Sequence, residues 1–312
     1  MKKILAIVML LSVVVGAWSK DKVKVACVGN SITFGTGVAS REVNAYPFVL
    51  GRLLGEGYEV GNFGKPGATL LVKGHRPYVL QEEYKKALEF AADIVVIHLG
   101  VNDTDPRNWP NYGDEFIGDY LALMDTFRMA NPKTHFIIAR ITPLSHRHPR
   151  FLAGTRDWHD EVQHRIEEVA RQSGAQLIDF HSLLYPYPGL LPDGIHPNAK
   201  GAELMAKTVY SAITGDFGGL QMSPLYSDNM VLQRGVPLDI HGKADAGEVV
   251  TVSLDKTKMT AKAGNDGRWK VVLPAQKADG TPRTLRIATK KRTLTYNNVA
   301  AVSYTHLTLP TT

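Results

Sequence analysis

The chain has 312 residues and a formal net charge of +6, with 44% hydrophobic and 21% charged residues. This is the composition of an ordinary globular protein, and the length favours two domains. The basic residues are spread along the chain, and the densest run, at 289–293, holds only three adjacent charges. Because nucleic-acid binding concentrates basic residues on one face, we expect no nucleic-acid partner; weak attraction to acidic glycans stays open.

The first residues have the pattern of an export signal. Two lysines precede an apolar stretch at 4–18, and Ala17 and Ser19 suit a cleavage site. A membrane anchor is the alternative, but the stretch is short for a full span and no positive stop follows it closely. We therefore expect cleavage of residues 1–19, no stable membrane insertion afterwards, and a periplasmic or secreted protein.

Strand-like apolar runs alternate with helix-like segments over residues 20–216. We expect strands at 22–28, 58–64, 92–100, 135–141 and 175–180, and helices at 44–55, 81–91, 117–130, 156–174 and 197–213. The run 92–100 is continuously apolar, as in a strand covered on both faces. The pattern predicts an α/β fold, a three-layer flavodoxin-like parallel sheet with helices on both faces. In such sheets functional residues lie on loops beyond the carboxyl ends of the strands.

The pattern changes after Asp216. Short alternating runs at 238–241, 249–254, 269–273 and 284–288 are separated by Gly, Asp, Asn and Pro, which predicts a small antiparallel, β-sandwich-like module over 217–302. Residues 303–312 do not continue this rhythm. That leaves open whether the chain stops inside a longer protein or carries a tail that is not native.

Ser31 follows the first predicted strand directly. A serine at a strand-to-helix turn is exposed and lies near free helical N–H groups, but its hydroxyl needs a base to become a nucleophile. Taken alone, Ser31 fits a helix N-cap or a turn serine better than a nucleophile. The single cysteine, Cys27, lies in the same apolar run and excludes an intrachain disulfide.

Three further loops carry suitable partners. Gly64 ends the second strand and Gly67 follows it, and both would let the backbone approach a ligand. Asn102 follows the third, where its neutral amide could donate to a developing oxyanion. Asp193 and His196 come after the last strand, at a spacing that lets a carboxylate orient an imidazole base. Each signal also has an ordinary reading as turn or capping chemistry, but their order along the chain favours one shared site.

The motifs resemble those of an SGNH hydrolase of the GDSL-like lipase/esterase superfamily. "GNSIT" (29–33), "NFGKPGAT" (62–69), "GVND" (100–103) and "DGIH" (193–196) match its four blocks, with Asn30 in place of the usual Asp. The resemblance covers about residues 22–215.

The resemblance implies a role for each matched position. Ser31 would be the nucleophile, His196 the base and Asp193 its orienter. The oxyanion hole would consist of the backbone N–H groups of Ser31 and Gly67 and the side chain of Asn102. We further expect substrate contacts from four residues: Asn30, Asp103, Trp109 and Tyr112. For Trp109 and Tyr112 the alternative is that the rings pack within the protein, as aromatic side chains on loops more often do.

The second part, 217–302, is similar to the N-terminal β domain of bacterial sialate O-acetylesterases, most distinctively in "SDNMVLQR" (227–234). Together the two resemblances imply a serine esterase that removes O-acetyl groups from carbohydrates, either sialate or plant polysaccharide, without a cofactor. A lipid or short-chain acyl esterase, a thioesterase and a non-catalytic glycan-binding module are the alternatives. A zinc hydrolase using His146, His148, Asp157 and His159 is another, although no further ligand is fixed by the pattern.

Overall fold

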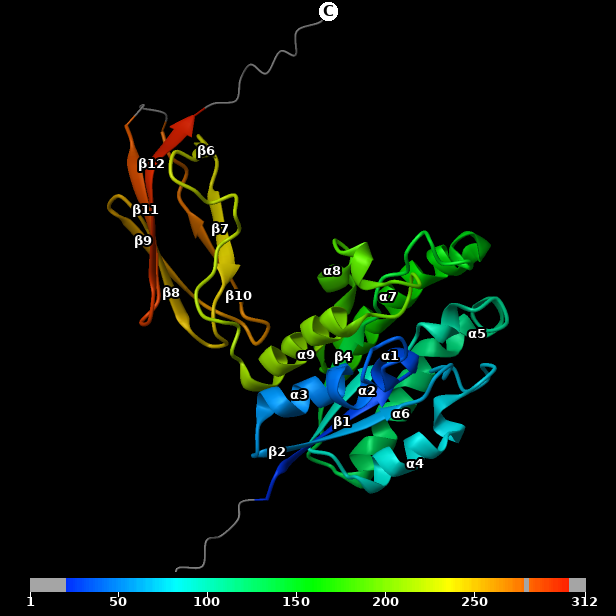
Figure 1. Ribbon diagram of the computed structural model, residues 1–312. Coiled ribbons are helices and arrows are strands. Elements are labelled where there is room, and N and C mark those ends of the chain that lie inside the picture. The colour runs from blue at the N-terminus through cyan, green and yellow to red at the C-terminus, as the bar shows by residue number, and fades with distance from the viewer. Residues whose placement is uncertain (1–20, 278–280, 303–312) are drawn as a thin grey trace, which may run out of the picture.

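The computed structural model describes residues 21–277 and 281–302, and within them two separate hydrophobic cores. The first core is built from residues between Val25 and Val209, the second from residues between Leu220 and Val299. Figure 1 shows the corresponding bodies side by side, joined after α9. The predicted export signal and the C-terminal tail lie outside the described residues. No helix in the described ranges is long and apolar enough to cross a membrane.

The first body, called the α/β body below, contains one parallel sheet in the order β2-β1-β3-β4-β5. Its strands are β1 (Val23–Gly29), β2 (Tyr58–Gly64), β3 (Ile94–His98), β4 (His135–Arg140) and β5 (Gln176–Asp179). This order reverses direction between β1 and β3, and such a switch point is where parallel sheets bind ligands. The predicted flavodoxin-like α/β fold is confirmed.

Helices cover both faces of this sheet (Figure 1). They are α1 (Ser31–Phe34), α2 (Arg41–Asn44), α3 (Tyr46–Leu54), α4 (Glu82–Glu89), α5 (Trp109–Tyr112), α6 (Phe116–Ala130), α7 (Arg156–Ser173), α8 (Phe180–Leu184) and α9 (Ala199–Thr214). Packing of α3 against α9 forms one layer, and α6 packs against α4 and α7 in the other. The residues of β3 between Val95 and Ile97 are completely buried, as the continuous apolar run predicted.

Shorter turns complete the connections. They are the 3₁₀ turns Tyr78–Leu80, Asn102–Thr104, Gly113–Glu115 and Pro188–Leu190 and the π-helical turn Phe151–Thr155. The helix predicted at 44–55 is broken at Ala45, which has an extended backbone. Pro47 follows in the first turn of α3, a position where proline favours a helix start.

The second body, called the β module below, has a two-stranded sheet, β10-β7, and a five-stranded sheet, β6-β12-β11-β8-β9. Its strands are β6 (Val231–Gln233), β7 (Leu238–Lys243), β8 (Val249–Leu254), β9 (Thr257–Lys262), β10 (Arg268–Leu273), β11 (Arg283–Ala288) and β12 (Thr293–Val302). The pairing is antiparallel as predicted, except that β12 and β6 are parallel. The runs recognised in the sequence correspond to β7, β8, β10 and β11, so β6, β9 and β12 were not predicted. β9 is an edge strand with Lys258 and Lys262, and it buries none of its side chains fully.

Candidate active site

Ser31 lies where β1 turns into α1, at the switch point of the sheet. The preceding residue, Asn30, caps the helix: its side-chain oxygen accepts the N–H of Ile32 at 3.0 Å. The turn requires Gly29, because a Cβ there would lie 2.1 Å from the Thr33 Oγ1 atom and 2.8 Å from the His98 carbonyl oxygen. Ser31 is therefore the first helical residue, at the helix end where N–H groups are free.

The structure brings Ser31, His196 and Asp193 into one line. The Nε2 atom of His196 lies 2.9 Å from the Ser31 Oγ atom, across 165 residues of sequence. Its Nδ1 atom lies 2.6 Å from the Asp193 Oδ2 atom. Because a carboxylate only accepts hydrogen bonds, Nδ1 carries the proton and Nε2 is free to accept that of the Ser31 hydroxyl. This is the geometry of a nucleophile, its base and the orienter of that base.

Backbone contacts lock the Asp193 side chain in place. Its Oδ1 atom accepts the N–H groups of Ile195 at 3.0 Å and His196 at 2.7 Å. Burial by itself would raise the pKa of Asp193, but these bonds and the imidazole outweigh it and lower the pKa below its ordinary value. Asp193 therefore stays ionised while its neighbour gains and loses a proton.

The loops after β2 and β3 lie against the Ser31 turn. The N–H of Lys65 donates to the Gly29 carbonyl at 2.9 Å. Gly64 allows this contact, because a Cβ there would lie 2.1 Å from the Phe34 backbone nitrogen. The side-chain Nδ2 of Asn102 donates to the Ala68 carbonyl at 2.9 Å, which leaves its second amide hydrogen for a ligand.

Two backbone donors are also available there. Gly67 has a φ of +77°, a conformation that favours glycine. Within the described residues, neither its N–H nor that of Ser31 donates to another protein group. The structure thus places all three predicted oxyanion donors on loops that are hydrogen-bonded to one another.

Asp103 is buried beneath the loops of Gly67 and Asn102, so it is not placed to contact a substrate. It is 0% exposed, and its two carboxylate oxygens accept the N–H groups of Leu70 at 3.0 Å and Leu71 at 2.8 Å. Burial raises its pKa to about 6, against the opposing effect of these bonds. Asp103 therefore ties the loop of Gly67 to the loop of Asn102.

The other expected substrate contacts also differ from the expectation. Asn30 is completely buried. Trp109 is buried in the α/β core, where its indole N–H donates to the Glu161 carboxylate at 2.7 Å. Only Tyr112 keeps part of its ring accessible, beside the ammonium of Lys73. The sequence suggested an open loop, but residues 109–112 form the short helix α5, which turns the large ring inward.

Two residues support the site in roles that the sequence analysis did not assign to them: Asn108 was not singled out, and His148 was considered only as a zinc ligand. Asn108 is buried between two loops, accepting the N–H of His75 at 3.0 Å and donating to the Asn102 carbonyl at 2.9 Å. His148 packs on the catalytic loop: a Cβ at Gly194, whose φ is +87°, would lie 2.9 Å from the His148 nitrogen. Both act through tertiary contacts, for which no sequence motif exists.

The residues considered for zinc do not gather. His146 and Asp157 are exposed, His148 is half-buried, and His159 is buried with its Nε2 atom 2.8 Å from the Thr142 carbonyl. Among the described residues, no three His, Cys, Asp or Glu side chains are grouped as metal ligands. Residues 145–150 instead pack against the catalytic loop, and Ser145 N–H donates to the Gly194 carbonyl at 2.8 Å.

The chain is similar to several known proteins. An acetylxylan esterase of Xylanibacter ruminicola is 39% identical over 214 residues, 62% of this chain and 44% of that protein. The chain therefore spans less than half the length of this relative. One solved structure is 24% identical with a TM-score of 0.50, covering 62% of this chain and 96% of its own. Est24, a carbohydrate acetylesterase from Sinorhizobium meliloti, is 18% identical over 63% of this chain and 100% of its own, with a TM-score of 0.49.

A sequence profile of the GDSL-like lipase/acylhydrolase family matches residues 27–204. The match contains all four loops described above, from the turn at Ser31 to the catalytic loop at His196. It covers more than half of the chain and leaves out the β module. The chain belongs to the GDSL-like lipase/acylhydrolase family.

Proposed function

We propose that this protein is a serine esterase that removes O-acetyl groups from carbohydrates. The observation that carries the proposal is the aligned Ser31, His196 and Asp193, with contacts of 2.9 and 2.6 Å. Family membership supports ester hydrolysis, and the 39% identical acetylxylan esterase supports an acetylated plant polysaccharide as the substrate class. O-acetylated sialic acid is the alternative suggested by the resemblance of the β module.

The reaction takes place in two halves. His196 Nε2 removes the proton of the Ser31 hydroxyl while the Oγ atom attacks the acetyl carbonyl carbon. The tetrahedral intermediate then expels the sugar oxygen, which takes the proton from His196. In the second half, His196 activates water, which attacks the acetyl-Ser31 ester and releases acetate. Asp193, ionised and bonded to Nδ1, stabilises the imidazolium that forms in each half.

The three oxyanion donors act on both tetrahedral intermediates. Two are backbone N–H groups, of Ser31 and Gly67, and the third is the Asn102 amide. Because they are fixed before the substrate arrives, they stabilise the new charge without reorganising. Asp103 and Asn108 keep the loops of these donors in register through the hydrogen bonds described above.

The test compares acetate release by the wild type and Ser31→Ala. The substrates are acetylated xylan, acetylated pectin, O-acetylated sialic acid and short-chain lipid esters. We expect the highest kcat/KM on an acetylated polysaccharide and no turnover by Ser31→Ala, which should also lose labelling by a fluorophosphonate. Turnover by Ser31→Ala would contradict the assignment of Ser31 as the nucleophile. A clear preference for the lipid esters would contradict the substrate class.

We further propose that the protein is exported, on the strength of the N-terminal sequence. N-terminal sequencing of the protein from the producing cell should begin near residue 20. An intact Met1 on the mature protein would contradict this.

A further inference from the structure

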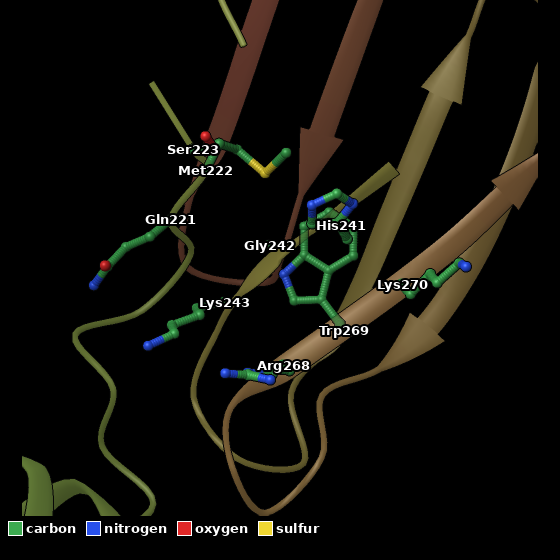
Figure 2. A pocket seen from close by; sticks show the side chains of 9 residues that line it. All are labelled: Gln221, Met222, Ser223, His241, Gly242, Lys243, Arg268, Trp269 and Lys270. Atoms are coloured by element: carbon green, nitrogen blue, oxygen red, sulfur yellow. The ribbon is translucent and has the colours of Figure 1, made fainter. Parts of the chain in front are cut away.

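The β module contains a cavity of about 640 Å³ that the reaction does not use. Three short segments line it: 221–223, 241–243 of β7 and 268–270 of β10. Figure 2 shows their side chains, with Gln221, Lys243 and Arg268 projecting to the same side. We call this surface the β7–β10 groove.

Strand pairing places five polar side chains on one face of the groove. Lys243 pairs with both Arg268 and Gln221, and His241 pairs with Lys270. Because neighbouring residues of a strand point to opposite faces, the paired side chains form two rows across the segments. The first row is Gln221, Lys243 and Arg268, and the second is His241 and Lys270. Ser223 lines the cavity beyond Gln221. The alternate residues Met222, Gly242 and Trp269 meet on the opposite face.

The first row places like charges directly opposite each other. Such cross-strand pairs are destabilising in a sheet unless a counter-charge intervenes. No carboxylate lines the groove. Lys270 is paired with Asp239 at 2.7 Å, whereas Arg268 has only Asp266 at 3.9 Å. The ammonium of Lys243 forms no ion pair within the described part of the chain, so an anion lying across Lys243 and Arg268 would offset the repulsion.

Sequence composition points the same way. Residues 217–302 contain 13 Lys and Arg against 7 Asp and Glu, and this excess equals the formal charge of the whole chain, +6. The rest of the chain is balanced. The excess positive charge of the chain therefore lies in the β module and not in the region that contains the catalytic residues.

The groove continues toward the α/β body. A second cavity, of about 570 Å³, shares Lys243 and Arg268 with it and extends along the edge strand β5 as far as Asp179 and Ser182. Asp179 ends β5 and so lies at the same edge of the sheet as the Ser31 turn. An extended chain bound in the groove can therefore continue along the body that contains the catalytic residues.

We propose that the β7–β10 groove binds an acidic glycan chain, with its carboxylates between Lys243 and Arg268 and its hydroxyls on Gln221, Ser223 and His241. This inference rests on the proposed function, since the bound chain would be the polymer that is deacetylated. Charge and hydrogen-bonding groups favour a glycan over other polyanions. The groove exposes no Trp, Tyr or Phe ring for base stacking and no aliphatic side chain for insertion into lipid.

The test measures binding by calorimetry in a Ser31→Ala background, so that the polymer stays intact. The probe is glucuronoxylan, and its control is the same polymer with its carboxyl groups reduced to alcohols. We compare Lys243→Gln/Arg268→Gln with Lys258→Gln/Lys262→Gln, which removes the same charge from the exposed strand β9. The groove variant should bind glucuronoxylan at least tenfold more weakly. The β9 variant should stay within twofold of the parent.

Other results would overturn the inference. Equal binding of the reduced polymer would remove the role of the carboxylates, and equal losses in the two variants would indicate bulk charge alone. Tighter groove-dependent binding of duplex DNA or of anionic phospholipid vesicles would assign the groove to that ligand instead. The binding assay does not depend on turnover. Binding without acetate release on any glycan would contradict the proposed function alone, and release without groove-dependent binding would contradict this inference alone.

Discussion

The catalytic site of the α/β body and the β7–β10 groove of the β module differ in whether their charged side chains have partners within the protein. In the body, charged and polar side chains at the site are compensated: Asp193 accepts from two backbone N–H groups and an imidazole, and Asp103 accepts from two more. In the module, Lys243 faces Arg268 across the strand pair without a lining carboxylate. Compensation inside the protein holds a catalytic geometry fixed, whereas charge left uncompensated is available to a ligand.

The sharpest test of the body is His196→Ala. Without the base, the Ser31 hydroxyl keeps its proton, and kcat should fall by about 10⁴-fold or more. Glucuronoxylan binding should not change, because the groove lies on the other body. The measurement is acetate release alongside calorimetry. A parallel loss of binding would show that the two regions are not independent.

The next largest effect is expected for Asn102→Ala. Loss of one oxyanion donor typically lowers kcat by about 10²- to 10³-fold. The Nδ2 bond to the Ala68 carbonyl is lost too, so thermal unfolding should be measured with the kinetics. A variant that folds normally and turns over at the wild-type rate would remove Asn102 from the oxyanion hole.

Asp103→Asn tests positioning rather than chemistry. The neutral amide accepts fewer hydrogen bonds from Leu70 and Leu71, so the Gly67 loop should lose its fixed position. We expect kcat to fall about tenfold with KM within twofold, since ground-state binding does not use the oxyanion donors. Asp119→Asn is the matched control, because Asp119 accepts the Val72 N–H of the same loop at 2.8 Å but from the exposed side. Equal effects of the two variants would indicate general loosening of the loop.

Acid should lower the stability of the α/β body, because its core contains two buried histidines. Burial lowers the pKa of His98 to about 3 and that of His159 to about 4. Both stay neutral in the folded protein but gain a proton on unfolding below their ordinary pKa of 6.5. Their contribution is complete above pH 6.5 and is lost as the pH falls toward 3 to 4. Within that window, each of the two histidines lowers the free energy of unfolding by about 1.4 kcal/mol for every pH unit that the pH falls.

The measurement is urea unfolding of the wild type and His98→Gln at pH 7 and pH 5. A glutamine can still accept the Thr142 N–H, which His98 Nε2 accepts at 3.3 Å. The variant should lose less stability on acidification. Asp103 opposes this trend between about pH 4 and 6, because its raised pKa lets the folded state bind a proton first. Identical slopes for wild type and variant would contradict the role of His98.

The smallest effect concerns the module. Lys243→Gln/Arg268→Gln removes a like-charged cross-strand pair, so the module should gain roughly 0.3 kcal/mol of stability at low salt. High salt screens the repulsion and should abolish the gain. Thermal unfolding at two salt concentrations measures this. A loss of stability at low salt would mean that the two side chains are compensated within the protein, and would weaken the case for a ligand.

Much of the body could be predicted because its signals are local. Continuous apolar runs mark strands covered on both faces, and Gly29, Gly64 and Gly67 mark backbone that must turn or approach closely. The order of the motifs indicated a serine, an amide and an imidazole on loops at one edge of a parallel sheet, and the structure places them there. The spacing of Asp193 and His196 also allowed their mutual contact to be predicted.

Burial and cross-strand register were decided only by the tertiary structure. Asn30, Asp103 and Trp109 have residue types suited to substrate contact, yet packing turns each of them inward. The β7–β10 groove could not be predicted from the sequence either, because Lys243 and Arg268 are far apart along the chain and become neighbours only through the pairing of β7 with β10. A sequence shows the chemistry that each side chain can perform. Which side chains share a face depends on long-range packing, and that packing assigned the catalytic residues to one body and the uncompensated charge to the other.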